Sequence, residues 1–170
     1  TTNIVSRVIG DVVARDAGAT APESRQVAIE SWLCERLFAP AGMHSATQKF
    51  DGSGNWVGSS YVFATARDFA RFGELYRNDG AVESGDRVLP AGWADHGRTF
   101  VAHDAEAAGA EGFDYGRHWW MWPEFPRSIA AHGYEGQYVV VVPDRELTLV
   151  HLGKTVRDQQ PALVGRLGEL

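Results

Sequence analysis

A short hairpin signal near the C-terminal end constrains the fold of this chain more than any other feature. Tyr138 to Val142 is an unbroken apolar run, which is typical of a buried strand. The turn residues Pro143-Asp144-Arg145 follow it, and residues 147–152 form a second run of alternating character. The pattern therefore predicts a β-hairpin whose first strand is buried.

Polar groups gather at the mouth of this hairpin, directly before its first strand. The residues concerned are His132, Gly133, Tyr134, Glu135, Gly136 and Gln137. Because glycine has no Cβ, the two glycines let the backbone approach a ligand closely. The segment 132–137 is therefore the first candidate for a binding edge.

The first half of the chain is expected to consist of helices joined by loops. Apolar residues recur at helical spacing over 4–13 and over 27–37, and a small polar linker separates the two stretches. Thr65, with Asp68 three residues later, matches the start pattern of a third helix. An apolar stripe supports that helix, and the Asn-Asp-Gly sequence that ends at Gly80 terminates it.

The second half is expected to change from helix and loop to sheet. Residues 103–112 are rich in alanine, glycine and acid without periodicity, and they predict an exposed, mobile insertion. A final helix over 161–170 is expected to cover one face of the sheet. Residues 1–127 are thus predicted to be a mostly helical or loop region, and residues 128–170 the hairpin and last helix.

Composition and charge narrow the class of function. The chain has 170 residues, of which 44% are apolar, so it can bury a core, and no run approaches the roughly 18 apolar residues of a membrane span. A net charge of −6 without a basic stripe argues against a nucleic-acid partner. The lone Cys34 rules out an internal disulfide and is expected to be buried. The histidines show no zinc-ligand spacing, so no metal site is expected.

The hairpin carries a resemblance to a known family. Its Gly-Tyr-Glu-Gly-Gln-Tyr pattern, apolar strand, proline and second apolar strand resemble the C-terminal hairpin of the serine β-lactamase and penicillin-binding-protein superfamily. The most similar branch is that of the class C β-lactamase-related esterases and 6-aminohexanoate-dimer hydrolases. Other segments similar to that branch are Leu37 to Met43, Gly58 to Tyr61, Ala64 to Gly73, Val88 to Trp93 and Tyr115 to Trp120.

The resemblance implies an α+β, β-lactamase/transpeptidase-like fold, in which a helical region precedes antiparallel strands and a C-terminal helix. It also implies cleavage of an ester or amide through an acyl-enzyme, without a cofactor. Family members carry the attacking serine in Ser-x-x-Lys, together with a tyrosine. None of the nine serines here has lysine three residues later, and the tyrosine that precedes a segment like Thr1 to Arg7 in the family is absent. The chain is therefore expected to be a C-terminal part that is inactive alone.

The resemblance also assigns roles at the hairpin mouth. The superfamily stabilises its tetrahedral intermediate with a backbone N–H on this strand, so Gln137 and the amide of a neighbouring residue are candidate oxyanion donors. Tyr134 stands where many relatives carry histidine. The Lys-Thr-Gly motif that binds a substrate carboxylate in better-known members is missing. Lys154 and Thr155 are not expected to replace it, because they are placed at the far end of the hairpin.

Several of these assignments have alternatives. Tyr61, Trp119 and Trp120 are candidates for a cleft wall or an apolar pocket, or else they fill the core. His132 and Gln137 are either site residues or ordinary exposed residues of a turn and a strand. The chain as a whole is either the hydrolase segment, a catalytically silent binding or regulatory module, or a structural fragment.

The expected partners follow from this interpretation. They are a small-molecule ester or amide substrate, and either the missing N-terminal part of the same protein or a second copy of the chain. Nucleic acid and a membrane span are not expected.

Overall fold

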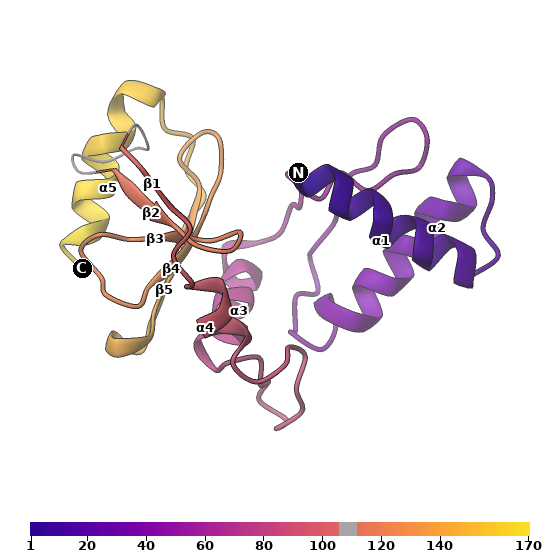
Figure 1. Ribbon diagram of the computed structural model, residues 1–170, viewed down its shortest axis with the longest axis horizontal. Helices are drawn as coiled ribbons and strands as arrows, with labels where there is room; N and C mark the ends of the chain where they lie inside the picture. Colours follow the sequence, from indigo (N-terminus) through magenta and orange to yellow (C-terminus); the bar gives the residue numbers. More distant parts are fainter. Residues whose placement is uncertain (106–111) are drawn as a thin grey trace. The chain divides into compact units, whose positions relative to one another are not determined.

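The computed structural model describes residues 1–105 and 112–170 (Figure 1). The chain forms two compact units, Thr1–Asp68 and Phe69–Leu170. Each unit has its own secondary structure and its own buried residues, and each is described by itself.

Two helices dominate the first unit, as predicted. They are α1 (Thr2–Asp16) and α2 (Pro22–Leu33), and α2 continues into a π-helical turn over Cys34–Phe38. Gly10 of α1 faces the fully buried Ile29 of α2, and a Cβ added at Gly10 would lie 3.1 Å from Ile29 Cδ1. The missing side chain therefore allows the two helices to pack closely.

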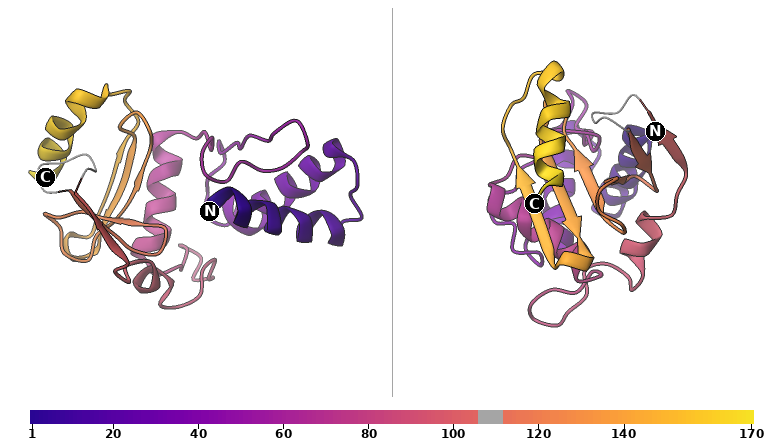
Figure 2. Two further views of the ribbon diagram at one scale, coloured as in Figure 1. Left: turned by 45° about the horizontal axis from the view of Figure 1, so that its top comes forward. Right: turned by 90° about the vertical axis from the view of Figure 1, so that its left-hand side faces the viewer.

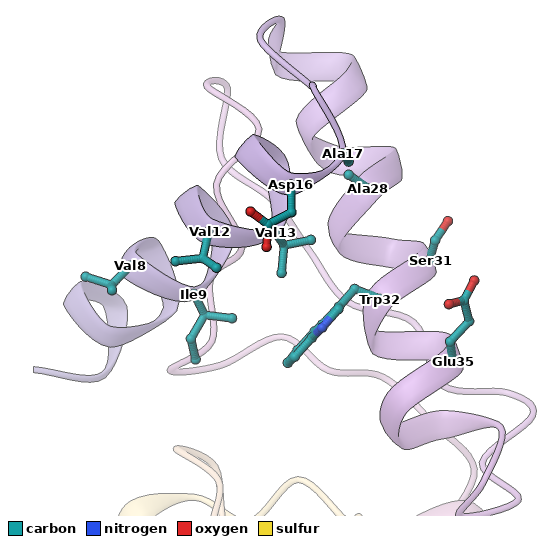
Figure 3. A pocket seen from close by; sticks show the side chains of 10 residues that line it. All are labelled: Val8, Ile9, Val12, Val13, Asp16, Ala17, Ala28, Ser31, Trp32 and Glu35. Carbon is teal, nitrogen blue, oxygen red and sulfur yellow. The ribbon is translucent and has the colours of Figure 1, made fainter.

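An apolar groove of about 680 Å³ lies between α1 and α2 (Figure 3). Its lining residues are Val8, Ile9, Val12, Val13, Asp16, Ala17, Ala28, Ser31, Trp32 and Glu35. Val8 of this lining is 58% exposed, and Ile4, one turn earlier on α1, is 70% exposed. Large apolar side chains on one helix face are usually buried, so this part of the first unit presents an open apolar surface.

The prediction that Cys34 is buried is wrong, because the cysteine is exposed. Leu33 and Phe38 are the residues of this stretch that enter the core. The π-helical turn that begins at Cys34 changes the helical spacing there, and Cys34 to Arg36 face solvent.

The third predicted helix is α3 (Ala66–Arg77), and it begins where the sequence indicates. The hydroxyl of Thr65 accepts a hydrogen bond of 3.2 Å from the amide of Asp68, which is the expected cap. The Asp68 carboxylate is buried and accepts two bonds from Ser45, one from the amide at 2.7 Å and one from the hydroxyl at 2.6 Å. The start of α3 is thus held by a loop of the first unit.

The second unit contains one antiparallel sheet of six strands in the order β1-β2-β3-β4-β5-β6. The strands are β1 (Ala102–Asp104), β2 (Phe113–Tyr115), β3 (Trp120–Met121), β4 (Ile129–His132), β5 (Tyr138–Val142) and β6 (Leu147–His151). The helices are α4 (Trp93–Gly97) and α5 (Gln160–Gly168), with 3-10 turns at Pro143–Arg145 and Arg157–Gln159.

The predicted hairpin is confirmed as β5 and β6, with Tyr138 paired to His151 and Val142 to Leu147. Three strands, β1 to β3, lie in the region that was expected to be mainly helix and loop. The start of the expected insertion at residue 103 belongs to strand β1, so that part of the prediction is wrong, and its residues 106–111 lie outside the described residues. Strands of two or three residues are too short to show a period in the sequence.

The sheet is buried on both faces by helices of the same unit (Figure 2). Tyr138, Val140 and Val142 point toward α5 and meet its buried Val164, together with the aromatic residues Phe113, Trp122 and Phe125. Ile129 and Val141 point the other way, toward Trp119 and the Phe72 and Tyr76 rings of α3. This explains why β5 is apolar at every position, and α5 covers one sheet face as predicted.

Candidate functional site

A tight turn with two glycines joins β4 to β5 at the predicted binding edge. The amide of Gly133 donates to the carbonyl of Gln137 over 2.7 Å, and the amide of Gly136 donates to the carbonyl of Gly133 over 3.2 Å. Gly136 has φ +80°, a left-handed conformation that glycine adopts without steric cost. These features define a three-residue hairpin loop closed by a left-handed glycine.

The amide of Tyr134 is the donor of this turn that the described structure leaves without a partner. Across a trans peptide the carbonyl of Gly133 and the N–H of Tyr134 point in opposite directions. Since that carbonyl is held by Gly136, the Tyr134 N–H points out of the loop, and it has no acceptor in residues 1–105 and 112–170. The Tyr134 side chain itself is 97% exposed.

The segment that follows β6 holds the other carbonyls of the turn. The Gln160 Nε2 atom donates to the Tyr134 carbonyl over 3.3 Å, and the Thr155 amide donates to the Glu135 carbonyl over 2.7 Å. His151 Nδ1 lies 2.9 Å from the carbonyl oxygen of Gly136. Three successive carbonyls therefore accept hydrogen bonds from residues 151–160, so the backbone of the turn is fixed from one side.

The side chain of Gln137 stabilises the turn from within. Its Oε1 accepts from the Glu135 amide over 3.2 Å, and its Nε2 donates to the Gly153 carbonyl over 3.3 Å. Both ends of the side-chain amide are therefore occupied. The amides of its neighbours Glu135 and Gly136 are bonded as well, so the turn amide without an acceptor among the described residues is that of Tyr134, three positions before Gln137.

His132 ends β4 inside an aromatic cluster. Its ring stacks on Trp120 at 5.1 Å with an interplanar angle of 11°, and it meets Phe113 and Tyr138 edge to face at 4.6 and 4.8 Å. Desolvation by burial lowers the pKa of His132 from its ordinary 6.5 to about 3, so the imidazole is uncharged at neutral pH. Its buried Nε2 has no hydrogen-bond partner among the described residues.

A cavity of about 810 Å³ lies beside the turn, between it and the start of α5. Its walls include the predicted site residues Trp120, His132, Gly133, Tyr134 and Glu135. The other residues of the wall, which were not predicted as site residues, are Asp104, Ala105, Tyr138, Lys154, Thr155, Val156, Arg157, Gln160 and Pro161. An apolar aromatic side and a polar rim are typical of small-molecule sites.

The expected position of Lys154 and Thr155 is wrong, because both lie at the mouth of the hairpin. Lys154 Nζ is 2.7 Å from Glu135 Oε1, an ion pair that raises the pKa of Lys154. In an antiparallel hairpin the end of the second strand returns to the start of the first, as the pairing of Tyr138 with His151 shows. Both partners of the ion pair are largely solvent-exposed, so it adds little to stability.

Trp119, Trp120 and Tyr61 are the remaining predicted site residues. Trp119 is buried against α3, on the sheet face opposite Trp120, so the two adjacent tryptophans do not form one pocket. Tyr61 belongs to the first unit, where it has φ +64° and is 59% exposed.

The described residues show neither a metal cluster nor a membrane helix. In 1–105 and 112–170, no three His, Cys, Asp or Glu side chains gather in a way that would hold an ion. No helix of the same residues has the length and apolar character to cross a bilayer.

Comparison with known proteins identifies the family of the chain. The family model described as Beta-lactamase matches residues 6–166. A search of curated protein sequences gives no match.

Several solved structures resemble the chain, and two of them illustrate the likeness. One is a "putative 6-aminohexanoate-dimer hydrolase" from Bacillus anthracis, with TM-score 0.65, 22% identity and coverage of 86% of this chain and 40% of its own. The other is a beta-lactamase from Mycobacterium bovis, with TM-score 0.60, 18% identity and coverage of 97% and 61%. The chain thus spans less than two thirds of the length of either structure. The likeness confirms the α+β, β-lactamase-like fold predicted from the sequence.

Proposed function

Because the chain belongs to the beta-lactamase family, we propose that it is the part of a serine hydrolase that binds the reacting carbonyl of an ester or amide. The observation that carries this proposal is the Tyr134 N–H, which points out of a fixed turn at the edge of the cavity and has no acceptor in the described structure.

The role of the Tyr134 amide follows from the charge that develops during acyl transfer. When a serine attacks an ester or amide, the carbonyl oxygen becomes an oxyanion. A backbone N–H that is already oriented stabilises this charge without reorganisation, and removing one such donor typically lowers kcat by about 10²–10³. The hydrogen bonds to the turn from residues 151–160 supply this orientation.

The cavity supports a role in substrate binding. Trp120 and the uncharged imidazole of His132 present a flat apolar wall, which suits the hydrocarbon part of an acyl or alcohol group. The Lys-Thr-Gly motif that binds a substrate carboxylate in better-known relatives is missing, and Lys154 pairs with Glu135 at the mouth of the hairpin. We therefore expect small esters to be better substrates than β-lactams, which carry that carboxylate.

The nucleophile has to come from outside these 170 residues. No serine of the chain stands in a Ser-x-x-Lys motif, which is the motif that places an activating lysine beside the serine in this family. The serine and its proton-transfer partners would be supplied by further sequence of the same protein or by another chain.

The proposal is tested with a fluorophosphonate probe and intact-mass analysis. The 170-residue chain alone is expected to remain unlabelled, and a protein that joins it to a segment with Ser-x-x-Lys is expected to take up one equivalent. Replacing the serine of that motif by alanine serves as the control and abolishes labelling. Stoichiometric labelling of any of the nine serines in this chain would contradict the proposal. No labelling of the joined protein would favour a catalytically silent module.

A further inference from the structure

We propose that His151 is a positioning residue for the turn 133–137, and that it acts by donating a hydrogen bond from Nδ1 to the carbonyl of Gly136. This inference rests on the proposed function, because the turn matters only if its amide binds the reacting carbonyl. His151 is the last residue of β6 and pairs with Tyr138, the first residue of β5. It therefore stands on a rigid strand beside the end of the turn.

The hydrogen bond determines which nitrogen of the His151 imidazole carries a proton. His151 Nδ1 and the Gly136 carbonyl oxygen are 2.9 Å apart, which is an ordinary hydrogen-bond length. A carbonyl oxygen only accepts, so the proton must be on Nδ1. A neutral His151 is then the Nδ1–H tautomer, with its Nε2 unprotonated.

The bond acts on the Tyr134 amide through one intermediate residue. Gly136 is in the left-handed conformation, with φ +80°, and its amide holds the carbonyl of Gly133. That carbonyl belongs to the same peptide as the Tyr134 N–H. Fixing Gly136 therefore fixes the direction of the donor that we assign to the oxyanion.

His151 is the side chain best placed for this task. The only other side chain from 151–160 that donates to a carbonyl of the turn in the described structure is Gln160, whose Nε2 is shared between the carbonyls of Tyr134 at 3.3 Å and Thr155 at 3.2 Å. The Thr155 contact comes from its backbone and does not depend on its side chain. Substitution of His151 therefore removes the shorter of the two side-chain hydrogen bonds that residues 151–160 donate to carbonyls of the turn in the described structure.

The first test measures the tautomer in the 170-residue chain. Long-range ¹H–¹⁵N correlation spectra show which ring nitrogen of a neutral histidine carries the proton. We expect the proton on Nδ1 of His151. His103 in β1 serves as an internal reference for the tautomer measurement, because it is also a strand histidine and its Nδ1 lies 2.8 Å from a carboxylate oxygen of Asp114. A predominant Nε2–H tautomer of His151 would overturn the proposal, and this measurement does not depend on any variant folding.

The second test compares two substitutions by amide hydrogen exchange. His151→Asn offers an N–H donor at a reach similar to Nδ1, whereas His151→Leu offers none. We expect exchange of the Gly136 amide to become about tenfold faster in the Leu variant and to return close to the original rate in the Asn variant. His103→Leu is the matched control and should leave that amide unchanged. Equal exchange in the original chain and His151→Leu would overturn the proposal.

Kinetics separate this inference from the proposed function. In a protein that joins the chain to a Ser-x-x-Lys segment, His151→Leu is expected to lower kcat about tenfold with KM nearly unchanged, and His151→Asn to restore it. If the tautomer and the exchange rates are as expected but kcat is not affected, His151 still orders the turn, and the assignment of the turn to the oxyanion is wrong.

Discussion

Gly136 is a residue of the turn at which both the backbone conformation and a close contact disfavour a side chain. Its φ of +80° disfavours any other residue, and an added Cβ would lie 3.0 Å from Thr155 Cβ. We expect Gly136→Ala to destabilise the fold by about 2 kcal/mol, of which about 1 kcal/mol comes from the left-handed backbone and the rest from the contact.

Two other glycines separate these contributions. Gly85 also has a positive φ, +89°, but a Cβ there meets nothing within 4 Å, and Gly52 has neither constraint. In urea unfolding, the loss of stability should increase from Gly52→Ala to Gly85→Ala to Gly136→Ala. Equal losses at Gly85 and Gly136 would show that the packing against Thr155 is unimportant.

His132 should make the stability of the chain depend on pH. Its pKa is about 3 in the folded chain and near 6.5 when unfolded, so only the unfolded state gains a proton as the pH falls below 6.5. The contribution of the neutral His132 to the free energy of unfolding is complete above pH 6.5, and it decreases toward pH 3 by at most about 1.4 kcal/mol per pH unit. Because of His132, the free energy of unfolding measured in urea should be about 2 kcal/mol lower at pH 5 than at pH 7. His132→Phe, which keeps an aromatic ring, should remove this part of the dependence, and an identical pH slope in both proteins would contradict the buried, uncharged imidazole.

At the scale of elements, α3 and the hairpin approach each other at Gly73. A Cβ at this position would lie 2.4 Å from Thr148 Cγ2 and 3.3 Å from Val141 Cγ2. Gly73→Ala should raise helix propensity by about 1 kcal/mol but still destabilise the fold by about 1–3 kcal/mol through this clash.

A double-mutant cycle tests whether Thr148 is the cause. Thr148→Ser removes the Cγ2 methyl and keeps the hydroxyl that donates to Glu74 over 2.5 Å. Combined with Gly73→Ala, it should recover at least about 1 kcal/mol in thermal or urea unfolding. Additive losses would show that the helix does not press on the strand at this point.

The sequence predicted elements whose pattern is long or well delimited. The hairpin has a continuous apolar strand and a Pro-Asp turn, and α3 has a cap at Thr65 and a glycine end, so both were placed correctly. Strands β1 to β3 were missed because two or three residues show no period. Burial at Cys34 was mispredicted because a π-helical turn shifts the helix face there.

The candidate site was predictable only where it is continuous in sequence. The turn was identified because its glycines and polar residues are adjacent, and their role stays a prediction. Lys154 and Thr155 were placed at the wrong end of the hairpin, and Gln160 was not considered, because their place beside the turn arises from the antiparallel return of β6 and the start of α5. The sequence predicted His151 only as a residue of the second strand. Its contact with Gly136 also arises because β6 runs back to the start of β5.

At the scale of the whole chain, the open apolar face of the first unit has a measurable consequence. Ile4, Val8 and Val12 of α1 are 70%, 58% and 42% exposed, beside the groove of Figure 3. We expect the chain alone to self-associate or to bind a hydrophobic dye such as ANS.

Substitution of this face provides the control for that expectation. Val8→Ser combined with Val12→Ser should lower dye binding and association, whereas Glu83→Gln, at an exposed position of the second unit, should not. If the chain is a monomer by light scattering, binds no dye and melts cooperatively, the apolar face does not bind another segment or a second copy.

The central claim, that the Tyr134 N–H binds the oxyanion, is tested most directly by removing that one hydrogen. In a protein that joins this chain by ligation to a Ser-x-x-Lys segment, tyrosine at 134 is replaced by its α-hydroxy acid, so that an ester oxygen takes the place of the N–H. The side chain and the fold are kept, and the same exchange at the exposed Glu83, whose N–H also has no acceptor among the described residues, serves as the control. We predict that kcat for a short-chain nitrophenyl ester falls by about 10²–10³ with little change in KM. An unchanged kcat in the Tyr134 ester, with the fold verified by circular dichroism, would contradict the account.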